Sequence, residues 1–274
     1  MVRGRPSGRG LSVIDGVATA YSATAGAWQR GPGRVYDRLA EVLLARSPVP
    51  VEGCRVLDVG AGTGAATRAA LAAGAAAVIA VDAAMGMLAH DAPQRAPAVV
   101  ADALALPFAA ATFGAAVAAF SLNHLTDPAG GLREMARVTR RGGALLASSY
   151  AADDSHPVKV AVEAALASHG WEPQGWYATV RAEAMSQLAT ADACAAAAEA
   201  AGLEAVVEPV HVAFPELGAG ELVAWRLGMA QHAPFVGRLP PAEQVAVAAE
   251  ALARLGDPAP PLVRSILVVS AVSR

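Results

Sequence analysis

The sequence predicts an α/β fold, a doubly wound sheet of seven mostly parallel strands that carries helical lid insertions. Three observations support this prediction. Short apolar strands alternate with helical segments between residues 55 and 150, which is typical of a parallel sheet covered on both faces. One strand leads directly into a glycine-rich loop at residues 60–64. Two further strands come late in the chain, so we expect the sheet to be completed after the helical insertions.

Residues 1–20 are expected to form a loose N-terminal tail, because the chain up to about Val13 is rich in glycine and arginine. Apolar residues at helical spacing then predict a helix over residues 21–45, which ends before Pro48. This helix opens a predicted core domain at residues 21–150. The core has expected strands at residues 55–60, 77–81, 99–101, 115–121 and 144–149, and expected helices at residues 65–73, 85–90 and 130–138.

Residues 151–190 are predicted to form a first helical lid insertion, with helices at residues 158–169 and 180–188. Residues 191–274 are predicted to complete the sheet. They contain an expected helix at residues 191–201, strands at residues 203–214 and 263–272, and a second helical insertion between these strands at about residues 216–258.

The tryptophans all lie outside residues 55–150, at Trp28, Trp171, Trp176 and Trp225. Two interpretations stay open. The alanine-rich insertions need bulky residues in order to pack, since alanine buries little area. The same aromatic residues are also suited to line an apolar pocket over the edge of the sheet.

The composition excludes several classes of function. A net charge of −3 offers no basic surface for nucleic acid. Two cysteines, Cys54 and Cys194, cannot form a disulfide framework or a zinc site of their own, and no spacing of histidine and acidic residues predicts a metal site.

No membrane association is predicted either. The uncharged run from Leu104 to Leu122 is as long as a membrane span, but Pro107, Thr112 and Gly114 divide it into a turn and a strand. Since no apolar stretch follows the arginine-rich start, the sequence shows no signal peptide, and we expect a cytoplasmic protein. The sequence makes no prediction about the oligomeric state.

The most informative segment is the strand and loop Val56-Leu57-Asp58-Val59-Gly60-Ala61-Gly62-Thr63-Gly64. Glycines permit a tight turn and a close approach of a ligand to the backbone, and the helix that follows presents free N–H groups. Asp82 ends the next strand, where a carboxylate can hold both hydroxyls of a ribose. The loop alone leaves the nucleotide open, because Gly60, Gly62 and Ala65 also satisfy a dinucleotide pattern.

Further segments narrow the choice. They are Asp58, the pair Val81-Asp82 followed by Met85 and Met87, residues 101–108 (ADALALPF), residues 120–125 (FSLNHL) and residues 137–143 (RVTRRGG). With these segments in this order, the chain resembles the class I S-adenosylmethionine-dependent methyltransferases of the small-molecule type found in ubiquinone and secondary-metabolite biosynthesis. The resemblance covers residues 21–150 strongly and the remaining strands by topology. It implies a Rossmann-like methyltransferase fold, with S-adenosylhomocysteine as the product of the cofactor.

The resemblance also implies roles for individual residues. The loop residues would back the amino-acid and ribose part of the cofactor, Asp82 would hold the ribose hydroxyls, and Asp58 would order the loop. Two residues would flank the adenine, while Asp102 would accept a hydrogen bond from its amino group. Ala83 and Met87 would flank the adenine, and Ala103 would donate its backbone N–H to it. Ser121 would lie below the sulfonium, and Tyr21 and Trp28 would belong to a helix that closes over the cofactor. The full set of implied cofactor residues is Tyr21, Trp28, Asp58, Gly60, Ala61, Gly62, Asp82, Ala83, Met87, Asp102, Ala103 and Ser121.

For the reaction, the resemblance implies methyl transfer by in-line displacement to a small acceptor, which we expect to be largely apolar or aromatic. His124 follows the fourth strand and is a candidate general base, although bracing of the loop, or contact with the cofactor through its backbone, is the favoured explanation. Methyltransferases of adenine bases or glutamine nitrogens carry Asn/Asp-Pro-Pro-Tyr/Phe at the position of Ser121-Leu122-Asn123-His124, so those acceptors are disfavoured. The candidate acceptor-binding residues are Trp171, Trp176, Tyr177, Trp225 and Lys159, the last being the lone lysine among 21 basic residues.

Two alternatives stay open at this point. A NAD-dependent oxidoreductase would use the same glycine loop, with Asp82 selecting the cofactor, but no Tyr/Lys or His/Asp pair for hydride transfer is evident. A methyltransferase-fold protein could also bind the cofactor for a reaction other than methylation.

Overall fold

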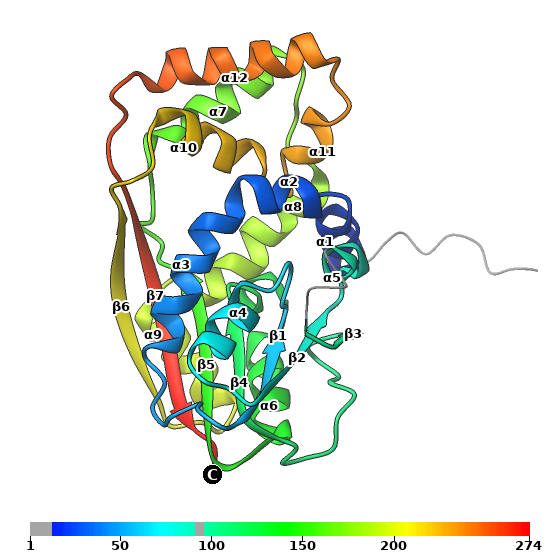
Figure 1. Cartoon of the computed structure of the whole chain (residues 1–274), viewed down its shortest axis with the longest axis vertical. Coiled ribbons are helices and arrows are strands. Elements are labelled where there is room, and N and C mark those ends of the chain that lie inside the picture. Colours follow the sequence, from blue (N-terminus) through cyan, green and yellow to red (C-terminus); the bar gives the residue numbers. More distant parts are fainter. Residues whose placement is uncertain (1–12, 91–95) are drawn as a thin grey trace, which may run out of the picture.

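The computed structural model describes residues 13–90 and 96–274, and these residues form one seven-stranded sheet in the order β3-β2-β1-β4-β5-β7-β6 (Figure 1). Strands β1 to β5 pair in parallel, whereas β7 is antiparallel to both of its neighbours. The predicted mostly parallel sheet is confirmed. The strands are β1 (Arg55–Val59), β2 (Ala77–Asp82), β3 (Ala98–Val100), β4 (Phe113–Ala119), β5 (Thr139–Tyr150), β6 (Ala205–Phe214) and β7 (Leu262–Val272).

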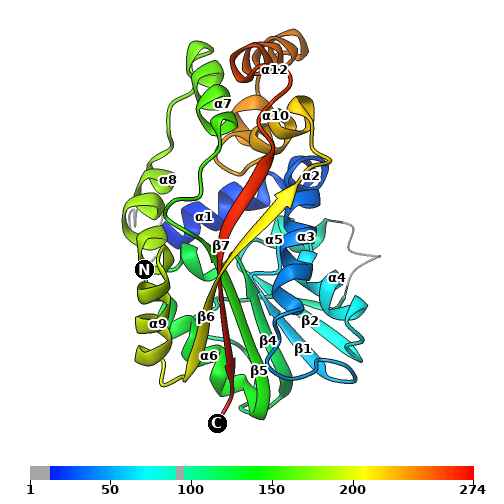
Figure 2. The same ribbon diagram turned by 90° about the vertical axis from the view of Figure 1, so that its left-hand side faces the viewer.

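Helices cover both faces of this sheet (Figure 2). Successive residues of β5 point to opposite faces of the sheet. Leu146 packs in the hydrophobic cluster that contains residues of α3 and α4, and Leu145 packs in the cluster that contains residues of α6 and α9. In the central strand β4, the alanines at positions 115, 116 and 118 are fully buried, so small side chains bring the helical layers close to the sheet. The covering helices are α3 (Pro32–Leu44), α4 (Ala65–Ala72), α6 (Pro128–Val138) and α9 (Ala191–Ala200).

The N-terminal region is more ordered than the sequence predicts. Residues 13–20, expected in the loose tail, belong to helix α1 (Val13–Ser22), while residues 1–12 lie outside the described part of the chain. The single helix predicted over residues 21–45 is divided into the end of α1, α2 (Ala25–Arg30) and α3. Pro32 starts α3 after Gly31, and a side chain at Gly31 would meet the backbone of Ala224. The segment therefore bends in order to pack against a helix from the distant second insertion.

The two helical insertions, separate in sequence, pack together beyond the carboxyl ends of the parallel strands (Figures 1 and 2). Helix α7 lies against both α10 and α12. No helix among residues 13–90 and 96–274 is long and apolar enough to span a membrane. The insertions contain α7 (Pro157–Ser168), α8 (Gly175–Thr179), the short turns η3 (Val180–Ala184) and η4 (Met185–Leu188), α10 (Ala219–Leu227), α11 (Ala233–Val236) and α12 (Pro241–Leu255).

Candidate active site

The glycine loop follows β1 and is held against the end of β2. The backbone N–H groups of Gly60 and Ala61 both donate to the carbonyl of Val81, at 2.7 and 2.9 Å. Gly60 has a φ of +70°, and a Cβ at this position would collide with the side chain of Ser121. The Ser121 hydroxyl in turn donates to the carbonyl of Val59 at 2.7 Å. Glycine is required here because β1 and the end of β4 approach each other so closely.

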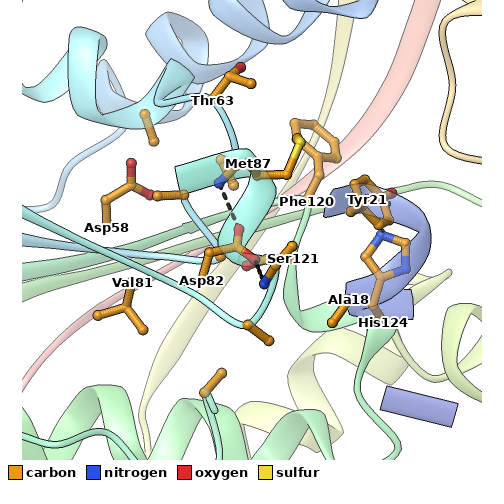
Figure 3. Close-up of a pocket in the computed structure, with 18 of the residues that line it drawn as sticks. Ala18, Tyr21, Asp58, Thr63, Val81, Asp82, Met87, Phe120, Ser121 and His124 are labelled. Carbon is orange, nitrogen blue, oxygen red and sulfur yellow. Dashed lines mark hydrogen bonds between the residues drawn. The ribbon is translucent and has the colours of Figure 1, made fainter. Parts of the chain in front are cut away.

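Asp82 connects the loops that follow β1 and β2 (Figure 3). Its Oδ2 accepts from the backbone N–H of Gly62 at 2.7 Å, and its Oδ1 accepts from the N–H of Ala84 at 2.8 Å. Each carboxylate oxygen has two lone pairs and can accept more than one hydrogen bond. The side chain can therefore fix both loops and still accept hydrogen bonds from a pair of ligand hydroxyls.

Two other carboxylates, Asp58 and Asp102, accept hydrogen bonds near the glycine loop and after β3. Asp58 is buried, and its Oδ2 accepts from the hydroxyl of Thr67 at 2.6 Å, which ties β1 to helix α4. Asp102 follows β3, and its Oδ1 accepts from the N–H of Leu104 at 2.9 Å. Met87, on the short helix α5 (Met85–Ala89), is buried and extends to within 3.3 Å of the position that a Cβ on Gly62 would take.

Aromatic residues of α1 to α3 cover this loop cluster. The Tyr21 hydroxyl lies 3.1 Å from Nε2 of His124, and the ring of Tyr21 lies 5.4 Å from that of Trp28. Gly86 allows α1 to dock, because a side chain there would meet the backbone of Ser22, whose hydroxyl accepts from the Gly86 N–H at 3.2 Å. Figure 3 shows Tyr21 and His124 side by side at one end of the cavity. Gly86 was not among the predicted residues, and a glycine at the start of a helix is its only signal in the sequence.

A cavity of about 150 Å³ lies between the loops and this aromatic cover. The structure brings together in its wall every residue that the resemblance assigned to the cofactor: Tyr21, Trp28, Asp58, Gly60, Ala61, Gly62, Asp82, Ala83, Met87, Asp102, Ala103 and Ser121. We call this the loop cavity. A glycine cradle, three carboxylates and a mostly apolar wall suit a nucleoside with an amino-acid chain.

A second cavity of about 520 Å³ lies between the loop cavity and the helical insertions. We call it the lid cavity. The two cavities share the residues of one wall, which are Tyr21, Tyr36, Phe120 and His124. Of the predicted acceptor residues, Lys159, Trp176, Tyr177 and Trp225 line the lid cavity. Other residues that line the lid cavity were not predicted from the sequence, chiefly Tyr36, Phe120, Tyr150, Asp154, Glu163, Arg181, Arg226 and Arg264.

Trp171 is the predicted acceptor residue that does not line the lid cavity. It is buried in the hydrophobic core of the insertions, where its Nε1 donates to the carbonyl of Gln231 at 3.2 Å. Its ring meets that of His232 edge-on, with centroids 5.0 Å apart. For this residue, packing of the insertions explains the tryptophan fully.

Burial changes the protonation of several groups around the cavities. It lowers the pKa of His124 to about 4, so the imidazole is neutral at pH 7. Burial also raises the pKa of Tyr21, Tyr36 and Tyr150 above the ordinary value for tyrosine, which keeps these phenols protonated. For Lys159, burial lowers the pKa and the nearby Asp154 opposes that shift.

Across residues 13–90 and 96–274, no group of three histidine, cysteine or acidic side chains could hold a metal ion. Cys194 is buried and Cys54 half-buried, and both are free thiols. Burial raises the pKa of the Cys194 thiol, which makes it a poor nucleophile.

Comparison with known proteins gives one family match. Residues 57–147 match a family model described as a methyltransferase domain. A demethylmenaquinone methyltransferase from Mycolicibacterium gilvum is 40% identical over 139 residues, which are 51% of this chain and 59% of that relative. The chain thus matches less than two thirds of the length of this curated relative.

Solved structures with the same fold include proteins with different reactions. Phosphoethanolamine N-methyltransferase 2 of Haemonchus contortus, in complex with S-adenosyl-L-methionine, is similar over 96% of this chain and 60% of that chain, with a TM-score of 0.59 and 17% identity. The cyclase SpnF is similar over 86% of this chain and 80% of that chain, with a TM-score of 0.52 and 21% identity. At these identities the similarity shows the fold alone.

Proposed function

We propose that this chain, in which residues 57–147 match a methyltransferase domain model, transfers a methyl group from S-adenosylmethionine to a small molecule with a largely apolar or aromatic body. The matched family does not favour the NAD-dependent alternative. When bound, the cofactor supplies an activated methyl group on a sulfonium.

One observation carries this proposal. The loop cavity and the lid cavity meet at a shared wall made of Tyr21, Tyr36, Phe120 and His124. In-line displacement needs donor and acceptor on opposite sides of the methyl group, aligned and away from water. A cofactor in the loop cavity and an acceptor in the lid cavity would meet this requirement.

The loop cavity fits the cofactor through specific groups of this chain. Gly60 and Gly62 line the cavity with backbone and no side chain, and the Asp82 carboxylate is of the type that can accept from two ribose hydroxyls. Asp102 would accept from the adenine amino group, and the buried Met87 would pack on the ring. Tyr21 and Trp28 would close the cavity from the N-terminal side.

In the lid cavity, Trp176, Tyr177 and Trp225 would hold the body of the acceptor. His124 is neutral at pH 7 and can accept a proton from an acceptor hydroxyl. It also contacts the Tyr21 hydroxyl at 3.1 Å, so the same side chain can serve to hold α1 over the cofactor. Most of the rate enhancement would come from alignment and exclusion of water.

The first experiment tests cofactor choice and reaction together. Isothermal titration should show binding of S-adenosylhomocysteine and not of NAD. Incubation with methyl-labelled S-adenosylmethionine and the small-molecule extract of a deletion strain should give a labelled product heavier than its precursor by one methyl group. Binding of S-adenosylhomocysteine without any labelled product would favour a non-methylating reaction instead.

A second experiment separates the two roles of His124. Tyr21→Phe removes the contact to Nε2 and keeps the ring, whereas His124→Asn removes the imidazole. If His124 acts as a base, His124→Asn should lower kcat well beyond the effect of Tyr21→Phe. Because the pKa of His124 is about 4, the wild-type plot of kcat against pH should show no inflection near pH 6.5. Equal losses in both variants would assign His124 to positioning of Tyr21.

A further inference from the structure

The charges around the lid cavity do not match a purely apolar acceptor. Four cationic side chains of the described residues line it, and two carboxylates do so. His124 adds no charge at pH 7, because burial lowers its pKa to about 4. The cavity is therefore cationic on balance. The cations are Lys159, Arg181, Arg226 and Arg264, and the carboxylates are Asp154 and Glu163.

The carboxylate of Asp154 already accepts hydrogen bonds from several groups of the protein. It accepts two hydrogen bonds from the Arg264 guanidinium, at 2.9 and 2.7 Å, and one from the Lys159 ammonium at 3.0 Å. The N–H of Ser265 donates to it as well, at 3.0 Å. Since one buried carboxylate serves two cations, positive charge remains at this wall.

Arg226 is less well paired. Its side chain is only 6% exposed, yet its partner, Oε1 of Glu163, lies 3.6 Å away and belongs to a side chain that is 36% exposed. Within the described residues the guanidinium donates no hydrogen bond, and its Nε is buried without an acceptor. Taking a guanidinium out of water without hydrogen-bond acceptors is costly, so a ligand anion would restore part of what burial removes.

We propose that the methyl acceptor carries an oxyanion, a carboxylate or a phosphate monoester, which Arg226 receives with Lys159 as the second cation. This inference rests on the proposed function, since it assumes that the lid cavity holds the acceptor. A guanidinium presents paired donors that match both oxyanions. The aromatic residues of the same cavity, Trp176, Tyr177 and Trp225, would take the apolar body of the molecule.

The test uses wild-type protein saturated with S-adenosylhomocysteine and three probes, namely benzoate, phenyl phosphate and the neutral benzamide. Titration calorimetry should show that benzoate or phenyl phosphate binds about tenfold or more tightly than benzamide. The tighter of the two anions identifies the oxyanion as carboxylate or phosphate. Equal binding of benzamide, or no measurable binding of either anion, would overturn the inference.

Variants then locate the anion. Arg226→Met keeps the length of the side chain and should abolish the preference for anions, while Arg226→Lys should retain part of it. Arg238→Met is the matched control, because Arg238 is exposed and lies outside the residues that line either cavity. If Arg226→Met does not fold, the wild-type probe series and Arg226→Lys still decide the question.

Cofactor titration keeps the two proposals distinguishable. Arg226→Met should bind S-adenosylhomocysteine as wild type does. A loss of cofactor affinity in that variant would assign Arg226 to the cofactor and overturn the inference. Failure of the wild type to bind S-adenosylhomocysteine would instead reject the proposed function, whatever the anion probes show.

Discussion

The loop cavity and the lid cavity are neighbours with one shared wall, but they are built in different ways. The loop cavity takes its glycines and carboxylates from one block of sequence, residues 58–103, with a cover from α1 to α3. The lid cavity collects residues from Tyr21 to Arg264, and its charged groups come from α7, η3, α10, β7 and the loop after β5. The difference teaches that one cavity can draw its glycines and carboxylates from a single stretch of sequence, whereas a neighbouring cavity is assembled from distant parts of the chain.

The largest effect is expected in the lid cavity. Asp154→Asn should lower the free energy of unfolding by about 3–5 kcal/mol, because it leaves the buried Arg264 guanidinium without its charged partner. Urea denaturation followed by tryptophan fluorescence measures the loss. Asp153→Asn changes the exposed neighbouring carboxylate and should have little effect. A loss at Asp154 below about 1 kcal/mol would mean that the ion pair does not support the lid.

In the loop cavity, we expect the carboxylate of Asp82 to affect the binding of the cofactor. Asp82→Ala is expected to weaken S-adenosylhomocysteine binding by about 2–4 kcal/mol, since it removes a charged acceptor and frees the N–H groups of Gly62 and Ala84. Isothermal titration checks this, with Asp192→Ala on the exposed face of α9 as control. Unchanged affinity would reject Asp82 as a cofactor ligand.

Two neutral histidines also occupy different regions, the half-buried His124 at the wall shared by the cavities and the buried His232 in the insertions. Burial lowers their pKa values to about 4 and about 3. Below the unfolded pKa of about 6.5 the unfolded chain binds protons that the folded protein excludes, so stability falls as the pH decreases and is constant above about pH 7. Between pH 7.5 and pH 5 each histidine should account for a loss of about 2 kcal/mol.

Variants separate this contribution from other titrating groups. In His232→Asn, the amide can replace the hydrogen bond that Nδ1 donates to the Arg226 carbonyl at 2.8 Å. The difference in unfolding free energy between pH 7.5 and pH 5 should then be about 2 kcal/mol smaller than in wild type. The same change at His124 should have a similar effect. An unchanged pH dependence in both variants would show that these histidines protonate in the folded protein.

The smallest effect is expected at Asp102. Asp102→Ala should weaken S-adenosylhomocysteine binding by about 1 kcal/mol, because one contact to the adenine amino group is lost. An analogue with inosine in place of adenosine lacks that amino group, so it should bind wild type and variant equally. A loss at Asp102 equal to that at Asp82 would mean that the two roles are assigned in the wrong order.

Much of the fold was predictable because its signals are local. The alternation of strands and helices, the glycines that end elements and the strand-to-loop segment around Gly60 each reflect the conformation of a few consecutive residues. The prediction of a loose tail over residues 1–20 was wrong at residues 13–20, which form part of α1. Helix α1 contacts Gly86 through Ser22, which lies 64 residues away in the sequence. A local sequence pattern does not reveal a contact between residues so far apart.

By itself the sequence determined the α/β sheet, the glycine loop at residues 60–64 and the position of Asp82 at the end of β2, because alternating elements and glycine-rich turns are signals carried by consecutive residues. The tertiary structure alone decided which aromatic residues face a cavity and which pack the insertions, as Trp225 and Trp171 illustrate. It alone revealed the cationic character of the lid cavity. Asp154 and Arg264 meet across 110 residues, and Arg226 comes from a third element, so only folding creates that arrangement of charge.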